Sequence, residues 1–151
     1  MRPTIKIEGL KALDAALGEL PKATAKNVLR RVGRKALEPM VAAARDGAPV
    51  KSGALRKSMK VTSRLSKRQA SLHRKMFKSD KASIELFAGA SNLPHAHLLE
   101  FGTVNMAPRP FMRPAWDGNH RGILDSIKKD LAIEIEKAAK RLAHKAARSG
   151  K

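Results

Sequence analysis

The chain has 151 residues, with 32 Lys or Arg against 13 Asp or Glu and a formal net charge of +19. This length is typical of one domain, and a hydrophobic fraction of 42% suffices to bury one modest core, which argues against wholesale disorder. The absence of Cys excludes a disulfide framework, a thiol nucleophile and any Cys-based zinc site. Because no stretch has transmembrane length and residues 1–17 lack the apolar run of a signal peptide, we expect a soluble protein made in the cytoplasm.

The first third of the chain is predicted to be mostly helical. Ile5 and Ile7 indicate a short strand, and a short amphipathic helix then ends near Gly18. Its apolar positions are Leu10, Leu13 and Leu17. A long helix follows, with Pro21 suited to its first turn and residues 47–49 ending it. Pro39 lies inside this pattern and is expected to remove one backbone hydrogen bond and bend the helix.

Two alternating segments predict a pair of strands with a basic insertion between them. Residues 59–65 and 82–88 each place apolar side chains on one face only. The insertion, residues 66–81, is polar and longer than a tight hairpin turn requires, and we interpret it as a protruding basic arm. Leu72 and Met76 also fit a short helix there, and periodicity does not decide between the two structures.

The last third combines a Pro-rich region with a second long helix. Residues 91–118 contain four prolines and are expected to be extended or looped, and loops of this size are usually functional. Residues 121–147 predict a C-terminal helix, whose apolar stripe is Ile123, Ile127, Leu131, Ile135, Ala139, Leu142 and Ala146. The predicted fold is therefore one α+β domain over residues 1–151. It has a small antiparallel sheet with a protruding basic hairpin arm, packed against a long helix in the N-terminal half and the long C-terminal helix.

Positive charge and aromatic side chains are segregated along the chain. Residues 51–81 hold eleven Lys or Arg and one acidic residue, whereas residues 82–116 are electrically neutral and hold four of the five aromatic residues. The excess charge favours a polyanionic or acidic partner. Single-stranded nucleic acid is disfavoured, because its binding sites place aromatic side chains inside a positive groove.

The sequence contains no constellation that predicts catalysis. No Ser lies in a nucleophile-elbow context, no carboxylates form an acid/base pair, and no Gly-rich phosphate loop is present. His95, His97 and Glu100 could be imagined as metal ligands, but three candidates on one short segment make a structural role more probable than a metal site. His73 and His144 lie among basic residues and are interpreted as solvated surface. We therefore expect no enzyme, no metal and no cofactor.

The segment at residues 108–115, Pro-Arg-Pro-Phe-Met-Arg-Pro-Ala, has two interpretations of equal weight. It can be a rigid connector into the last helix. It can also be a preformed extended strip that presents Phe111 and two arginines to a partner at a low cost in ordering.

Four segments, in order, resemble one protein family. They are residues 7–13 (Ile-Glu-Gly-Leu-Lys-Ala-Leu), 48–59 (Ala-Pro-Val-Lys-Ser-Gly-Ala-Leu-Arg-Lys-Ser-Met), 97–103 (His-Leu-Leu-Glu-Phe-Gly-Thr) and 110–115 (Pro-Phe-Met-Arg-Pro-Ala). They are similar to the tail-component family of long-tailed double-stranded DNA phages, whose members are also called neck or tail-completion proteins. Ser52 stands where the family usually has Thr, and Met112 where it usually has Leu. The arm at residues 66–81 matches no motif of the family.

The resemblance implies a structural virion protein of the head–tail junction, made in the bacterial host cytoplasm and assembled as a ring around the DNA channel. Six copies would match the symmetry of the tail. The implied partners are further copies of the chain and neighbouring neck and tail proteins, with no membrane. Candidate interface residues are Leu55, Arg56, Glu100, Phe101, Gly102, Thr103, Arg109, Phe111 and Arg113. Substitution of Phe111 is expected to block assembly while leaving the monomer folded.

The basic arm offers a second interpretation, in which the chain is a nucleic-acid-binding protein that grips duplex DNA phosphates without sequence preference. Contact with duplex DNA or with an acidic protein ring is assigned to Lys60, Arg64, Lys67, Arg68, Arg74, Lys75 and Lys78. Weak contact of this kind is also compatible with the neck interpretation. An enzyme of phage lysis or DNA processing ranks third, because no catalytic constellation supports it.

Overall fold

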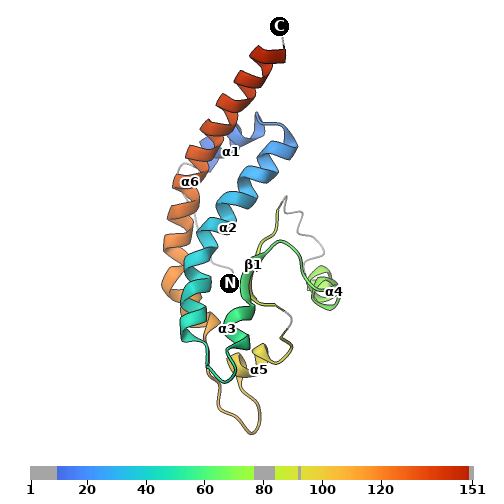
Figure 1. Ribbon diagram of the computed structural model, residues 1–151, viewed down its shortest axis with the longest axis vertical. Helices are drawn as coiled ribbons and strands as arrows, with labels where there is room; N and C mark the ends of the chain where they lie inside the picture. The colour runs from blue at the N-terminus through green and yellow to red at the C-terminus, as the bar shows by residue number, and fades with distance from the viewer. Residues whose placement is uncertain (1–9, 77–83, 92, 150–151) are drawn as a thin grey trace.

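The computed structural model describes residues 10–76, 84–91 and 93–149 as an elongated molecule built on two long antiparallel helices (Figure 1). The elements in chain order are α1 (Leu10–Gly18), α2 (Lys22–Gly47), α3 (Ala54–Ser58), β1 (Met59–Thr62), α4 (Lys67–Met76), β2 (Phe87–Ala90), α5 (Ala96–Phe101) and α6 (Met112–Ser149). The predicted α+β class is confirmed. The strand predicted at Ile5 and Ile7 lies outside the described residues.

Helix α2 forms because its apolar side chains recur every four residues. Pro21 occupies the N-cap position, where its missing N–H breaks no helical hydrogen bond. The buried side chains are Val28, Val32, Ala36, Met40, Val41 and Ala44. Pro39 lies on the exposed side, and α2 continues beyond it to Gly47. The predicted ends of α1 and α2 are confirmed.

Helix α6 runs along most of the molecule, with α5 and the loop after it extending beyond its first residues, and it begins earlier than predicted (Figure 1). It starts at Met112, not at residue 121, so the predicted boundaries of the Pro-rich loop (91–118) and of the last helix (121–147) are corrected. Pro114 does not interrupt the helix, because the N–H groups of a first turn have no intrahelical acceptor. The loop region also contains the short helix α5. Further along α6, Ala138 is buried and Ala139 is exposed, the reverse of the predicted stripe.

The core runs between α2 and α6 in two clusters. One surrounds Met40, Met59 and Phe111 where the small sheet meets the helices. The other joins α1, the N-terminal half of α2 and α6; its buried members are Leu20, Val28, Val32, Leu131, Ile135 and Ala138. The partly buried Ile127 contacts both clusters and links them along α6.

The sheet consists of β1 and β2, paired antiparallel with Met59 opposite Ala90 and Val61 opposite Ala88. Val61, Ala88 and Ala90 pack on the first core cluster, as the predicted alternation requires. The predicted strand bounds are corrected: β1 ends at Thr62, not at residue 65, and β2 runs from Phe87 to Ala90, so it overlaps the predicted 82–88 only at its first two residues. Residues 82 and 83 lie outside the described residues.

The basic insertion between the strands is helical in its described part. Helix α4 lies beside the sheet, away from the α2–α6 pair (Figure 1). Ser66 and Gln69 start it with a reciprocal capping box: the Gln69 backbone N–H donates to Ser66 Oγ, and the Ser66 backbone N–H donates to Gln69 Oε1. The helical alternative for the arm is therefore the one found. Among the described residues, no helix is long and apolar enough to cross a membrane.

Candidate subunit and partner interface

The carboxylate of Glu100 caps the N-terminus of α6. The backbone N–H groups of Phe111 and Met112 donate to Glu100 Oε2 at 2.8 and 3.0 Å, and that of Arg113 donates to Oε1 at 3.0 Å. These N–H groups have no acceptor within the helix, and the helix dipole favours a negative charge at this end. Glu100 thus ties the end of α5 to the start of α6.

The surroundings of Glu100 lower its pKa. Burial raises the pKa of the carboxyl, but the backbone N–H groups of Met112, Phe111 and Arg113, together with the charge of Arg113, outweigh that effect. Glu100 is therefore held in its charged form as a structural cap. It is the third member of the His95, His97 and Glu100 set, and no group of three or more His, Cys, Asp or Glu in the described residues could hold a metal ion.

Gly102 makes the sharp turn that follows α5. Its φ is +78°, and a Cβ there would lie 2.8 Å from the carbonyl oxygen of Met106 and 2.9 Å from the nitrogen of Pro108. The following loop is closed by paired backbone hydrogen bonds between Thr103 and Met106. The Arg109 N–H then donates to the Leu99 carbonyl at 2.8 Å, which returns the chain to α5. Only glycine fits the Gly102 position without strain.

Arg56 of α3 caps the C-terminal end of α2. Its guanidinium donates to the carbonyl oxygen of Ala48 from Nε and Nη2 and to that of Asp46 from Nη2, at 3.2–3.3 Å. These contacts satisfy carbonyl groups at the C-terminal end of α2, where a cation is favoured. The structural role of Arg56 is therefore to hold α3 against the end of α2.

The structure places the predicted interface residues in two different environments. Phe111 and Leu55 are buried in the first core cluster, with exposed fractions of 3% and 9%. Phe101 is 68% exposed, and the Arg113 guanidinium lies 6.0 Å from its ring centroid. Phe111 therefore supports the monomer directly, which corrects the expectation that its substitution leaves the monomer folded. The surface available to a partner is carried by Phe101, Thr103, Arg109 and Arg113.

An open apolar groove of about 990 Å³ lies beside Phe101, between α4, α5 and the start of α6. Its lining includes Arg68, Leu72, Leu93, Pro94, Phe101, Met112, Arg113 and Trp116. Leu72 and Trp116 are about half exposed. Leu72 and Trp116 were not among the predicted interface residues. For Trp116 the sequence did hold a signal, because it is the single Trp of the chain and lies in a neutral segment, and exposed Trp is typical of protein interfaces.

The described Lys and Arg side chains of the basic arm, and the two that precede it, are exposed. Lys60, Arg64, Lys67, Arg68, Arg74 and Lys75 all face solvent, and Lys78 lies outside the described residues. His73, expected to be solvated, instead contacts the ring of Phe87 edge-on at 5.3 Å between centroids and lies 3.9 Å from the carboxylate of Glu85. His73 therefore anchors α4 to β2. Four of the six basic side chains (Lys67, Arg68, Arg74 and Lys75) project from that anchored helix, whereas Lys60 lies on β1 and Arg64 lies in the loop before α4.

Comparison with known protein families gives one match. Residues 11–102 match the sequence model of a family described as "Bacteriophage HK97-gp10, putative tail-component". The matched region runs from α1 to the Gly102 turn and includes the sheet, the arm and Glu100. No curated protein and no solved structure matches the chain.

Proposed function

The chain belongs to the HK97-gp10 tail-component family of bacteriophages, and we propose that it acts at the phage neck or the upper end of the tail, as one subunit of a ring around the DNA channel. It is a structural tail component, located in the virion. The finer role, joining the head to the tail or completing the tail, is our proposal, as is synthesis in the host cytoplasm. The family match over residues 11–102 is the observation that supports the proposed place at the neck or upper tail.

The apolar groove supports a contact between copies of this chain. Copies with a net charge of +19 repel one another, so self-association is least unfavourable at an electrically neutral surface. Residues 82–116 are neutral and contribute Phe101 and Trp116 to the groove. Aromatic side chains with an Arg beside them are typical anchors of protein interfaces. We propose that the groove receives the neighbouring subunit in a heterologous, ring-closing contact.

Complementation of a phage that lacks the gene tests this role. We expect heads and tails to accumulate unjoined, as seen by negative-stain electron microscopy, and the wild-type gene to restore joined virions. A Phe101→Ala/Trp116→Ala variant should fold but fail to restore joining, because it removes the exposed aromatic anchors without opening the core. Ile133→Ala is the matched control, since Ile133 is also half exposed but lies on α6 away from the groove. Joined, infectious particles without the protein, or its absence from purified virions, would disprove the proposal.

The exposed arm supports an alternative function, in which the chain is chiefly a sequence-independent binder of duplex DNA. Four basic side chains of the described arm, together with Lys60 and Arg64 just before it, are exposed to solvent. If six phosphates are neutralised, the logarithm of the association constant should fall against the logarithm of salt concentration with a slope of roughly −5. Binding that hardly responds to salt would exclude this alternative.

A further inference from the structure

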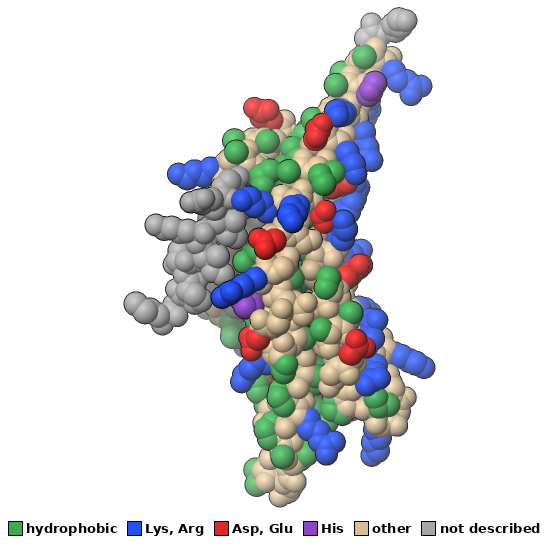
Figure 2. Space-filling model, turned by 90° about the vertical axis from the view of Figure 1, so that its left-hand side faces the viewer, with side chains coloured by type: hydrophobic (Ala, Val, Ile, Leu, Met, Phe, Trp, Pro, Cys, Tyr) green, Lys and Arg blue, Asp and Glu red, His purple; other side chains and the backbone are tan. Residues whose placement is uncertain are grey.

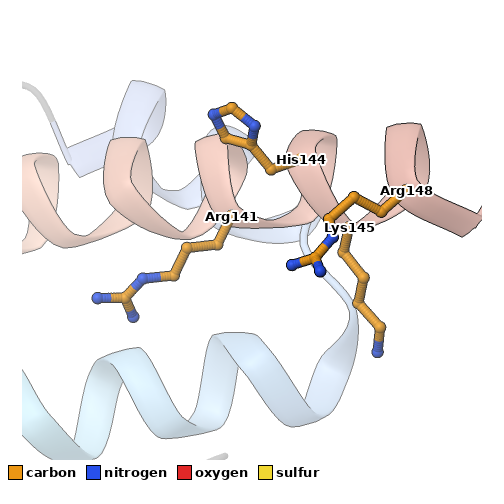
Figure 3. A pocket seen from close by; sticks show the side chains of 4 residues that line it. All are labelled: Arg141, His144, Lys145 and Arg148. Atoms are coloured by element: carbon orange, nitrogen blue, oxygen red, sulfur yellow. The ribbon is translucent and has the colours of Figure 1, made fainter.

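A second basic surface lies on α2 and α6, distant in sequence from the arm. A shallow depression of about 520 Å³ along α2 is lined by Asn27, Arg30, Arg31, Arg34, Lys35 and Glu38. A second depression, of about 470 Å³, lies near the end of α6 and is lined by Arg141, His144, Lys145 and Arg148. In Figure 3 the side chains of Arg141, Lys145 and Arg148 project from α6 toward the side of α2, whereas His144 points the other way. We call the seven Lys and Arg residues of these two depressions the cationic face.

Two ion pairs join α2 to α6 and show that both depressions lie along the same boundary between these helices, which we call the seam. Arg31 of α2 contacts Glu134 of α6 at 2.6 Å, and Lys35 contacts Asp130 at 3.0 Å. In this antiparallel register each turn toward the N-terminus of α2 meets the next turn toward the C-terminus of α6. Arg141 therefore lies about two turns beyond Glu134, on the same seam, and Lys145 and Arg148 extend it. Space-filling side chains of Lys and Arg gather along one long edge of the molecule (Figure 2).

Most of the positive charge on this face is not neutralised within the described part of the chain. The carboxylates of Glu134 and Asp130 are engaged by Arg31 and Lys35, and Glu134 also by Lys137. No ion pair or side-chain hydrogen bond involves the remaining five cations in that part: Arg30, Arg34, Arg141, Lys145 and Arg148. Four of the five are Arg, whose planar guanidinium fits phosphate oxygens with two parallel hydrogen bonds. The cationic face can therefore bind several anionic groups arranged in a row.

The composition of the face selects nucleic acid over an acidic protein. Protein interfaces rely on large apolar anchors. No large hydrophobic side chain is exposed on the described helix α2, and beyond Trp116 the only one on α6 within residues 117–148 is Ile133. Phosphate backbones need no such anchors. Because neither α2 nor α6 beyond Trp116 contains Phe, Tyr or Trp, the face has no aromatic side chain on which unpaired bases could stack, which favours a duplex.

We propose that the cationic face binds the phosphate backbone of duplex DNA without sequence preference. From Asp130 to Arg148 the seam runs about 27 Å along α6, which corresponds to roughly eight base pairs. The proposal rests on the charge geometry of α2 and α6 and not on the role in the tail, and it assigns DNA contact to a different surface from the arm.

Fluorescence anisotropy with the full chain and a labelled 30-base-pair duplex of mixed sequence tests the assignment. Association constants are measured between about 50 and 250 mM NaCl, where the log–log slope reports about 0.9 per phosphate contacted. The face variant is Arg141→Gln/Lys145→Gln/Arg148→Gln. The matched control, Lys67→Gln/Arg74→Gln/Lys75→Gln, removes the same charge from the arm. Both variants alter exposed side chains only, and unchanged circular dichroism and urea midpoints establish that they fold.

We expect the face variant to lose about 2.7 from the magnitude of the slope and the arm variant to keep the wild-type slope. Arg30→Gln/Arg34→Gln should lower the slope further when combined with the face variant. A slope that falls only in the arm variant would place the contact on α4 and overturn the proposal, and so would equal losses in both variants. Absence of salt-dependent binding by the wild type would point to an acidic protein instead. Tighter binding to the corresponding single strand would overturn the assignment to a duplex.

Discussion

Glu100 is the residue on which the geometry of the α5–α6 region depends most directly. Replacing its carboxylate with an amide removes the charge that three backbone N–H groups share. We expect Glu100→Gln to lower the free energy of unfolding by about 1–2 kcal/mol, since charge-assisted caps are worth about this much and the site is partly exposed to water. Urea denaturation measures the change. Glu136→Gln is the control: it also removes a carboxylate from an ion pair, with Lys140, but that pair is on the surface of α6, and the urea midpoint should hardly change.

The lowered pKa of Glu100 predicts how this stabilisation depends on pH. Its folded pKa is below the ordinary value of 4.5, so the charged form is favoured in the folded protein. The contribution is complete above the unfolded pKa and is lost as the pH falls through the folded pKa. The difference in unfolding free energy between wild type and Glu100→Gln should be largest at about pH 6–7 and should shrink toward pH 3. A difference that stays constant over this range would show that the carboxylate charge is not what stabilises the cap.

Gly102 provides a second test at the scale of one residue. Gly102→Ala forces a Cβ onto backbone atoms at a positive φ, and we expect a loss of about 2 kcal/mol or more in unfolding free energy. Gly122→Ala is a control of opposite sign, because Gly122 lies within α6 with open space around it and Ala is the better helix former by about 1 kcal/mol. Comparable urea midpoints for the two variants would contradict the assigned role of Gly102.

At the scale of elements, α4 is the helix with the least support. None of its ten residues is buried and none packs on either core cluster, whereas α1 and α5 each pack apolar side chains on one of them. His73 links α4 to β2. Isolated helices of this length are marginal in water. In hydrogen–deuterium exchange we expect the amides of residues 71–76 to exchange at least about a hundredfold faster than those of residues 32–44 in α2, because local opening there does not require the core to open. Exchange of α4 as slow as that of α2 would show that the arm is packed firmly in the free chain.

The same elements show which parts of the fold could be predicted from the sequence. The extents of α1 and α2 followed from apolar periodicity, since each helix buries one stripe of its own residues. The start of α6 could not be predicted in this way, because the Pro-rich pattern around Pro114 indicates a loop although the first turn of a helix accepts proline. The Ser66–Gln69 capping box was present in the sequence and would have favoured a helical arm.

Within the candidate interface, the sequence located the segments but not the roles of their residues. The segment at residues 97–103 was identified as a motif, yet its Glu caps a helix that begins at residue 112. That role depends on which segments meet in space, which no local pattern contains. The burial of Phe111 also depends on which segments meet in space. The prolines around it are compatible with an exposed strip, but at the start of α6 the Phe111 ring packs in the core with residues of α2 and β1.

At the scale of the whole molecule, the apolar groove and the cationic face of α2 and α6 are separated. The groove and the loop after α5 belong to one end, whereas α6 projects at the opposite end, where the C-terminus lies (Figure 1). The cationic face extends along α2 to that projecting end. A subunit built in this way can contact a further copy through the groove without bringing the two cationic faces together.

The net charge of +19 should make the isolated chain more stable as salt is added. Mutual repulsion favours the expanded unfolded chain, and it is screened once the Debye length falls to about 10 Å near 0.1 M salt. Salt also weakens the ion pairs that join α2 and α6, but exposed pairs contribute little and like charges are far more numerous. From 20 to 300 mM NaCl we expect the unfolding free energy, measured by urea denaturation, to rise by about 1 kcal/mol. The Arg141→Gln/Lys145→Gln/Arg148→Gln variant should gain less, because it has three fewer positive charges to screen. A fall in stability with salt would mean that the Arg31–Glu134 and Lys35–Asp130 pairs outweigh the repulsion among the unpaired positive charges.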